Sequence, residues 1–344
     1  MRVIEERCVI DLGMMTRLLM FLVESGEKTG KRYPDHRTGQ RQEMRKLATI
    51  KEFKNIERER WTGMMQECYL FEIKNDESIM FGQIVIGAPG AGKTTYCDGM
   101  SQILSQLDRP VICVNLDPAN DYVPYKCDID IRELVKVEDI TSRLNLGPNG
   151  ALRYCMQTLK KNMEWLRLKL SHVDGYLLFD FPGQLELYNS DDCITSIIHS
   201  MEKWGLRLVA VHLSDSLYCS DAGKFISVLL SALSIMINLE CAQINVLSKQ
   251  DLLEDNDLPY NFEFFEQLPD ASRLVELLDE SPILKQYKGL NEMLCSVIGD
   301  YDLVNFTGLD VTSRKHMLNI LKLADTANGY AFTDAPDLRN IVQK

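Results

Sequence analysis

The chain has 344 residues, 45% hydrophobic and 26% charged, a composition that excludes a fibrous or wholly disordered protein and allows one large or two ordinary domains. The formal net charge is −12, and residues 1–79 hold 15 Lys and Arg against 14 Asp and Glu, so the acidic excess lies in the remainder. An acidic body argues against direct binding along nucleic acid, because contacts to phosphates need a basic face.

The ten cysteines include no Cys-x-x-Cys pair, and the five histidines do not cluster with them at zinc-ligand spacing. Free thiols in a reducing compartment are therefore favoured. No uninterrupted run of 18 apolar residues occurs, which predicts no membrane-spanning helix and no membrane partner. Asp11 and Arg17 interrupt the apolar residues 8–23, so these do not fit a secretory signal. We expect a cytoplasmic protein.

Residues 1–79 are predicted to form an N-terminal extension outside the folded domain. From Glu24 to Arg60 the chain is crowded with Lys, Arg, Glu and Gln, and its few aliphatic residues show no sustained period. Such a segment is typical of a solvated helix or of disorder rather than of a core.

From Phe81 onward, short apolar runs alternate with amphipathic stretches, the pattern of βαβ units and a parallel sheet. The gap of about 55 residues that follows Leu252 is longer than one crossover connection between strands needs. Extra helices are therefore expected around residues 252–300. The predicted strands are 84–86, 111–115, 176–179, 208–213, 244–247 and 303–306. The predicted helices include 94–107, 151–170, 191–204, 224–239 and 313–326.

The first predicted strand leads into a Gly-x-x-x-x-Gly-Lys-Thr phosphate loop. The glycines allow backbone N–H groups to point at a triphosphate, Lys93 reaches the β- and γ-phosphates, and Thr94 offers a hydroxyl to Mg²⁺. A simple glycine turn is the alternative, but the position between a strand and a helix favours nucleotide binding. The fold class predicted is thus α/β, a doubly wound, mostly parallel sheet of the P-loop NTPase type with helical insertions. The binding residues of this loop are Gly87, Pro89, Gly90, Ala91, Gly92, Lys93, Thr94 and Thr95.

Two later strands end in carboxylates. Asp117 follows the second strand, where it could polarise the nucleophilic water or help to order it beside Mg²⁺; a turn-forming Asp-Pro is the alternative. The next strand ends in Asp180-Phe181-Pro182-Gly183-Gln184. Here Asp180 can hold the Mg²⁺ shell, the Gly183 amide can meet the γ-phosphate, and Gln184 can reach the attacking water. An Asx or Pro-Gly turn is the alternative.

A further strand ends in Ser248-Lys249-Gln250-Asp251, similar to the Asn/Thr-Lys-x-Asp that reads guanine in GTPases. Asp251 can accept hydrogen bonds from guanine N1 and N2, where adenine offers no donor. The stem of Lys249 would lie over the base. A helix cap starting at Asp251 is the alternative. Thr307 is the candidate for the fifth GTPase segment.

Together with Gly147-Pro148-Asn149, these motifs resemble the GPN-loop GTPases, a family named for a Gly-Pro-Asn insertion, and its second eukaryotic paralogue in particular. The resemblance covers about residues 80–332. It rests also on the stretches Phe81-Gly82-Gln83, Lys93-Thr94-Thr95-Tyr96-Cys97, Asn115-Leu116-Asp117-Pro118-Ala119-Asn120, Leu146-Gly147-Pro148-Asn149-Gly150, Lys224-Phe225-Ile226-Ser227-Val228 and Ala327-Asn328-Gly329-Tyr330.

The resemblance implies a GTPase domain over residues 80–332, with the Gly-Pro-Asn insertion around 140–155 and a helical insertion around 252–300. It implies GTP and GDP as substrate and product, with Mg²⁺ held by Thr94, Asp117 and Asp180. Catalysis would involve Lys93, Asp117, Gln184 and Asn149, the last acting in the partner's site across a dimer. The dimer would be a homodimer or a heterodimer with a sibling paralogue. RNA polymerase II subunits or assembly factors would be clients, with shuttling from cytoplasm to nucleus.

The chain departs from the family pattern at both ends. Met80 looks like a natural family start, so residues 1–79 are interpreted as an over-extended translation start, a disordered tail or an adaptor segment. Residues 333–344 form only a short C-terminal tail. Two other functions stay open: an assembly scaffold in which GTP is mainly structural, and a P-loop kinase. A kinase is disfavoured because residues 252–300 hold one arginine, Arg273, too few for a phosphate lid.

Overall fold

The computed structural model describes residues 79–189, 192–253, 258–268, 271–278, 287–301 and 304–333. All of them belong to the unit Asp76–Lys344. The predicted extension, apart from residue 79, and the predicted tail, apart from residue 333, lie outside the described residues.

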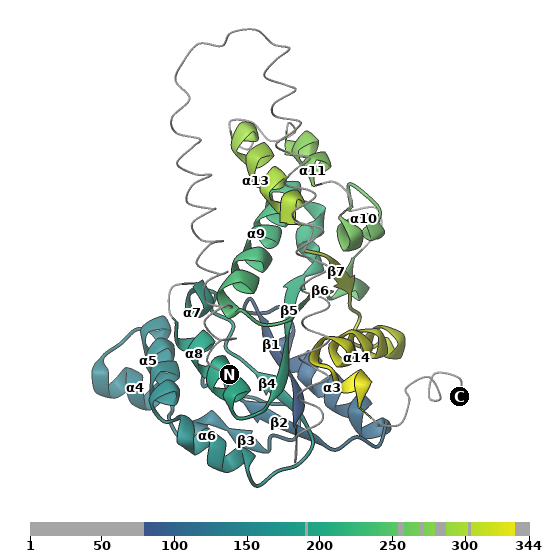
Figure 1. Cartoon of the computed structure of the whole chain (residues 1–344). Helices are drawn as coiled ribbons and strands as arrows, with labels where there is room; N and C mark the ends of the chain where they lie inside the picture. Colours follow the sequence, from purple (N-terminus) through teal and green to yellow (C-terminus); the bar gives the residue numbers. More distant parts are fainter. Residues whose placement is uncertain are drawn as a thin grey trace, which may run out of the picture. The chain divides into compact units, whose positions relative to one another are not determined.

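Seven parallel strands form one sheet in the order β3-β2-β4-β1-β5-β6-β7 (Figure 1). The central strand β1 has β4 on one side and β5 on the other, so the chain winds outward from β1 in both directions. This confirms the predicted doubly wound parallel sheet. In such a sheet, ligands bind beyond the carboxyl ends of the strands where the strand order reverses. The strands are β1 (Phe81–Gly87), β2 (Val111–Asn115), β3 (Ile129–Asp130), β4 (Tyr176–Asp180), β5 (Arg207–Asp215), β6 (Gln243–Ser248) and β7 (Phe306–Gly308).

Helices cover both faces of the sheet, which explains why the central strands are nearly continuous apolar runs. Figure 1 shows α5, α6 and α8 on one side of the sheet and α3 and α14 on the other. Ile84 and Ile86 of β1 pack in the cluster with residues of α5, α6 and α8, whereas Val85 packs in the cluster with residues of α3 and α14. The helices are α3 (Lys93–Gln106), α4 (Val137–Leu144), α5 (Pro148–Lys161), α6 (Met163–Leu170), α7 (Glu186–Asn189), α8 (Cys193–Lys203), α9 (Ala222–Leu239), α10 (Phe262–Gln267), α11 (Ser272–Leu277), α13 (Lys288–Tyr301) and α14 (Arg314–Asn328).

Helix α9 is the one described helix that is long and apolar enough to cross a membrane, by length and composition alone. Its composition has another explanation, because it is a core helix. Phe225, Leu229 and Ala232 are fully buried, in a cluster that also contains residues of α10, α11 and α13 and of β7. A helix packed on more than one side needs apolar residues around most of its circumference.

Four elements differ from the sequence prediction. The single helix expected over 151–170 is two helices, because Asn162 leaves helical geometry and its side-chain amide donates to the carbonyl of Thr158 at 2.7 Å. The last strand begins only at Phe306, later than expected. Strand β3 and helix α4 were not predicted: β3 has two residues, and no residue of α4 is buried. A two-residue strand has no period to detect.

Candidate functional site

The loop between β1 and α3 has the backbone of a phosphate cradle. Gly87, Gly90 and Gly92 have φ angles of 141°, 78° and 90°, which residues with a side chain rarely adopt. A Cβ on Gly87 would lie 2.2 Å from the carbonyl oxygen of Leu213, so this position also lacks room for any side chain. Helix α3 then starts at Lys93 with its positive N-terminal end at the loop.

Lys93 extends back over this loop. Its Nζ donates to the carbonyl of Ala88 at 3.2 Å, and the residue is only 8% exposed. Burial lowers the pKa of the Lys93 ammonium, although the nearby carboxylates of Asp180 and Asp117 oppose this shift. The ammonium is thus a desolvated positive charge next to the cradle, where a phosphate would bind.

The segment after β4 closes on the same loop. A Cβ on Gly183 would lie 2.6 Å from Lys93 Nζ and 2.9 Å from the backbone nitrogen of Pro89. Only glycine fits between these atoms. The Oε1 atom of Gln184 is buried and has no hydrogen-bond partner among the described residues. The structure therefore brings Gly183 to the phosphate loop, and the next residue in the chain, Gln184, has a side-chain acceptor that no described residue uses.

Thr94 and Asp180 form the candidate metal site. The Thr94 hydroxyl donates to Asp180 Oδ2 at 2.9 Å, whereas Asp180 Oδ1 is buried without a hydrogen-bond partner among the described residues. Burial raises the pKa of the Asp180 carboxyl to about 6, opposed chiefly by the hydrogen bond from Thr94. A buried carboxylate oxygen without a donor is an unfavourable arrangement that a cation or its bound water would relieve.

These residues fit Mg²⁺ because hydroxyl and carboxylate oxygens are its preferred protein ligands. Within the described ranges, no three His, Cys, Asp or Glu side chains gather at a site that could hold a metal. In the usual Mg²⁺ site of nucleotide enzymes, one or two protein ligands act together with waters and phosphates.

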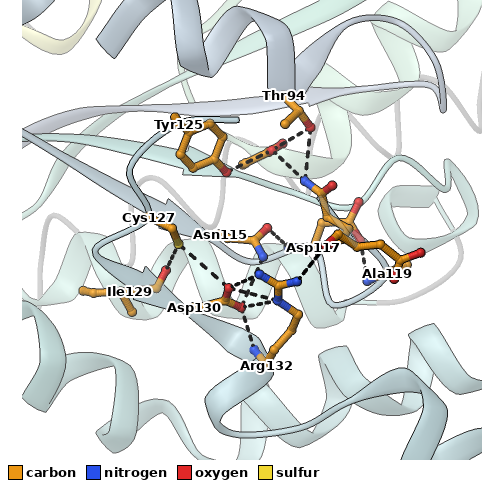
Figure 2. Close-up of polar contacts among 12 residues, drawn as sticks. Thr94, Asn115, Asp117, Ala119, Tyr125, Cys127, Ile129, Asp130 and Arg132 are labelled. Carbon is orange, nitrogen blue, oxygen red and sulfur yellow. Dashed lines mark hydrogen bonds and ion pairs between the residues drawn. The ribbon is translucent and has the colours of Figure 1, made fainter. Parts of the chain in front are cut away.

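Asp117 forms the Asp-Pro turn that was the alternative to a catalytic role. Its Oδ1 accepts from the Ala119 N–H at 3.0 Å (Figure 2). The turn does not remove it from the site. Burial raises the pKa of the Asp117 carboxyl, and Lys93 acts on it in the opposite direction. Asp117 therefore lies within electrostatic range of the phosphate-loop lysine.

Two residues of the site were missed by sequence reasoning. Asn120 Nδ2 donates to Thr94 Oγ1 at 3.2 Å, and the Tyr125 hydroxyl lies 3.1 Å from Asp180 Oδ2 (Figure 2). Asn120 could have been found from the sequence, because it ends the stretch Asp117-Pro118-Ala119-Asn120 that follows the second strand. Tyr125 had none, as it stands in a loop without periodicity.

The predicted base-reading segment contacts the phosphate loop directly. Ser248 is buried, and its Oγ lies 2.7 Å from the carbonyl oxygen of Ala91. Lys249 adopts a φ of 60° and its Nζ donates to Asp215 Oδ2 at 2.6 Å. Asp251 is exposed in the short 3-10 helix Gln250–Leu252. Its carboxylate is therefore accessible to a base.

Thr307 lies in β7, paired with Val246 of β6. The loop that follows approaches the base-reading segment, because the Gln250 N–H donates to the carbonyl of Leu309 at 3.1 Å. The residues after β7 are thus placed next to Gln250, as a fifth segment would require.

The Gly-Pro-Asn tripeptide, unlike the motifs above, makes no hydrogen bond to the phosphate loop within the described part of the chain. Gly147 caps helix α5, Pro148 occupies its first turn, and both are exposed together with Asn149. Proline is well suited to the first turn because it needs no hydrogen-bond partner there. The structure places these residues at an exposed helix start.

Comparisons with known proteins agree with this arrangement. The chain matches the family described as "Conserved hypothetical ATP binding protein" over residues 85–330. It is 49% identical over 266 residues to GPN-loop GTPase 2 of Danio rerio, covering 77% of this chain and 85% of the relative. It is 48% identical over 258 residues to GPN-loop GTPase QQT1 of Arabidopsis thaliana, covering 74% and 87%. Among solved structures, the apo form of a GTPase from Pyrococcus abyssi superposes with a TM-score of 0.59 at 25% identity, covering 72% of this chain and 97% of that one.

Proposed function

Because the chain belongs to the GPN-loop GTPase family, we propose that it hydrolyses GTP to GDP and phosphate with Mg²⁺. The observation that carries the proposal is the closure of Gly183 on Lys93 and Pro89. Nearby in the chain, one oxygen of Asp180 and one of Gln184 are buried with no hydrogen-bond partner in the part of the chain that the structure describes. A nucleotide with its cation and water would satisfy these groups together.

Each side chain then has a role that its position supports. Lys93 and the loop N–H groups bind the β- and γ-phosphates, and the Gly183 N–H donates to the γ-phosphate. Gln184 orients the attacking water through its Oε1, and Asp117 polarises that water. Thr94 and Asp180 would hold Mg²⁺, which neutralises phosphate charge when bound.

Guanine is the proposed base, although the description of the matching family mentions ATP. The exposed carboxylate of Asp251 accepts hydrogen bonds from guanine N1 and N2, and adenine has no donor there. Calorimetric binding of GDP and of ADP, each with Mg²⁺, tests the assignment. A strong preference for GDP is expected. Equal binding, or a preference for ADP, would contradict it.

We further propose that the enzyme acts as a dimeric switch in which Asn149 enters the partner's site. The support is the exposure of the tripeptide at the start of α5, together with exposed apolar side chains nearby on α4 and α5, Leu144 and Tyr154. Asn149→Ala is expected to slow hydrolysis while leaving nucleotide affinity almost unchanged.

A mixing experiment tests the action across the dimer. Asn149→Ala has an intact phosphate loop, whereas Lys93→Ala has an intact tripeptide. If Asn149 acts in trans, mixing the two impaired variants raises turnover in the mixed dimers above that of either variant alone. No recovery in a mixture shown to contain mixed dimers would contradict it.

The cellular role is proposed from the family resemblance: assembly and nuclear import of RNA polymerase II, from the cytoplasm, with a sibling paralogue or a second copy as partner. The test is a tagged chain expressed in cells depleted of the endogenous protein. Recovery of polymerase subunits on the tag, and their cytoplasmic retention on depletion, would support it. Normal nuclear polymerase after depletion would contradict it.

A GTP-stabilised scaffold is the second candidate, and one observation favours it. Leu290, Met293 and Val297 follow one another at helical spacing on α13 and are 50%, 63% and 41% exposed. Hydrolysis does not need such a surface. If Asp117→Ala and Gln184→Ala abolish turnover but still support function in cells, the scaffold is favoured over the switch.

A further inference from the structure

We propose that Asn120 and Tyr125 are positioning residues for the cation: they hold Thr94 and Asp180 in the arrangement that Mg²⁺ requires before it arrives. The inference rests on the proposed GTPase function and concerns two residues to which that function assigns no role. It follows from how hydrogen bonds are distributed over one carboxylate and one hydroxyl.

The two oxygens of Asp180 have very different surroundings. Oδ2 accepts from Thr94 Oγ1 at 2.9 Å and from the Tyr125 hydroxyl at 3.1 Å, with Asn120 Nδ2 at a longer 3.5 Å. Oδ1 is buried and has no hydrogen-bond partner among the described residues. Donors on one oxygen alone fix the rotation of the carboxylate and leave the other oxygen free for a cation or its water.

The hydroxyl of Thr94 is held in the same way. It has one hydrogen and two lone pairs. The hydrogen is donated to Asp180 Oδ2, and one lone pair accepts from Asn120 Nδ2 at 3.2 Å. One lone pair is left. Asn120 and Asp180 therefore set the direction of the remaining lone pair, which is the one available to a metal.

Asn120 is in turn anchored to the edge of the sheet. Arg132 donates through Nη1 to the Asn120 carbonyl at 3.0 Å, and its Nη2 is paired with Asp130 Oδ2 at 2.6 Å (Figure 2). Asp130 belongs to β3, which is in register with β2 at Asn115. Asn115 is also the register partner of Asp180 on β4. Asp130, Asn115 and Asp180 therefore form one row across β3, β2 and β4. This row contains the Asp180 carboxylate and also Asp130, which holds the arginine that binds the Asn120 backbone.

The Tyr125 hydroxyl is buried, so its hydrogen bond to Asp180 does not compete with bulk water. Residues that orient metal ligands without touching the metal commonly change metal affinity about 10- to 100-fold when they are removed. Removing either donor leaves Asp180 and Thr94 in place and bonded to each other, but with one hydrogen bond fewer to fix their orientation. The expected loss is therefore in Mg²⁺ affinity and not in nucleotide binding itself.

The experiment compares the full chain with Tyr125→Phe and Asn120→Ala. Affinity for a fluorescent GDP analogue is measured in EDTA, and then as a function of Mg²⁺ concentration at constant pH. Tyr122→Phe is the matched control, because it removes the same atom from a tyrosine three residues away that is 77% exposed. Thermal unfolding confirms that each variant folds.

We expect affinity in EDTA to stay within about twofold of wild type for all variants. The Mg²⁺ concentration for half-maximal tightening should rise about tenfold in Tyr125→Phe and in Asn120→Ala, and not in Tyr122→Phe. An unchanged Mg²⁺ requirement in both variants would overturn the inference and leave GTP hydrolysis standing. Equal weakening with and without Mg²⁺ would also overturn it, since it would indicate a general loss of site structure. A wild-type protein insensitive to Mg²⁺ would overturn the metal assignment and the inference together.

Discussion

Adding one methyl group to Gly183 should inactivate the enzyme. In Gly183→Ala the new Cβ would lie 2.6 Å from Lys93 Nζ, 2.9 Å from the backbone nitrogen of Pro89 and 3.1 Å from the Pro89 Cα. The lysine end can rotate away, but the Pro89 backbone belongs to the phosphate loop and cannot move without distorting it. Both adjustments affect atoms that bind phosphate.

The expected size of the effect follows from these contacts. Overpacking by one methyl group costs about 1–3 kcal/mol of the free energy of unfolding, which a folded protein tolerates. Turnover should fall much further, because a shift of about 1 Å in a catalytic group can cost about 100-fold in rate. Alanine keeps the backbone N–H at position 183, but a shift of this segment would move that donor away from the γ-phosphate and add to the loss.

Single-turnover GTP hydrolysis and GDP affinity are measured on wild type, Gly183→Ala and Gly299→Ala. Gly299 is the matched control: it is exposed on α13, and a Cβ there meets no atom within 4 Å. Gly299→Ala should retain full activity and gain about 0.5–1 kcal/mol in stability, because alanine is the better helix former. Wild-type turnover in a folded Gly183→Ala would show that this segment does not contact the phosphates.

Three further predictions concern the base site, the metal site and the core. Asp251→Asn replaces one acceptor oxygen by a donor NH₂ group. GDP affinity should therefore fall at least about tenfold, while xanthosine diphosphate should bind better. An unchanged base preference in calorimetry would contradict the role of Asp251. Burial raises the pKa of Asp180 to about 6, and Mg²⁺ binds the ionised form. Protons therefore compete with the metal for Asp180. The Mg²⁺-dependent gain in GDP affinity should be complete near pH 7 and should decline about tenfold per pH unit as the pH falls through 6. A gain that stays constant down to about pH 5 would contradict this prediction. Arg109→Ala leaves Asp325, which is 0% exposed, as an uncompensated buried charge. The Arg109→Ala substitution should lower the free energy of unfolding, measured by urea titration, by about 3–5 kcal/mol and should leave the Mg²⁺ requirement unchanged. A loss below about 1 kcal/mol would show that this ion pair does not stabilise the core.

Motifs that depend on local chain geometry were accessible from the sequence. The glycines at 87, 90 and 92 could be predicted as loop positions because residues with a side chain rarely adopt their positive φ angles. Most strands and the main helices were also predictable, since the alternation of apolar and polar residues is set by local geometry and by burial on both faces.

Other features were not accessible because they depend on strand register. The row Asp130, Asn115 and Asp180 exists only once β3, β2 and β4 pair, and β3 is too short to have a sequence pattern. The convergence of Tyr125 on Asp180 joins residues 55 positions apart. No local propensity contains that information.

The chain by itself determined the α/β fold class, the phosphate loop and the segments that end its strands, because each of these follows from residue types at fixed local spacing. The tertiary structure alone decided that Asp180 has one oxygen with donors and one without any donor among the described residues, and that Tyr125 donates to Asp180 while Asn120 donates to Thr94. It also decided that Gly183 must be glycine, for the reason that Lys93 and Pro89 lie against it. Such constraints arise from contacts between distant segments, and those contacts exist only in the packed fold.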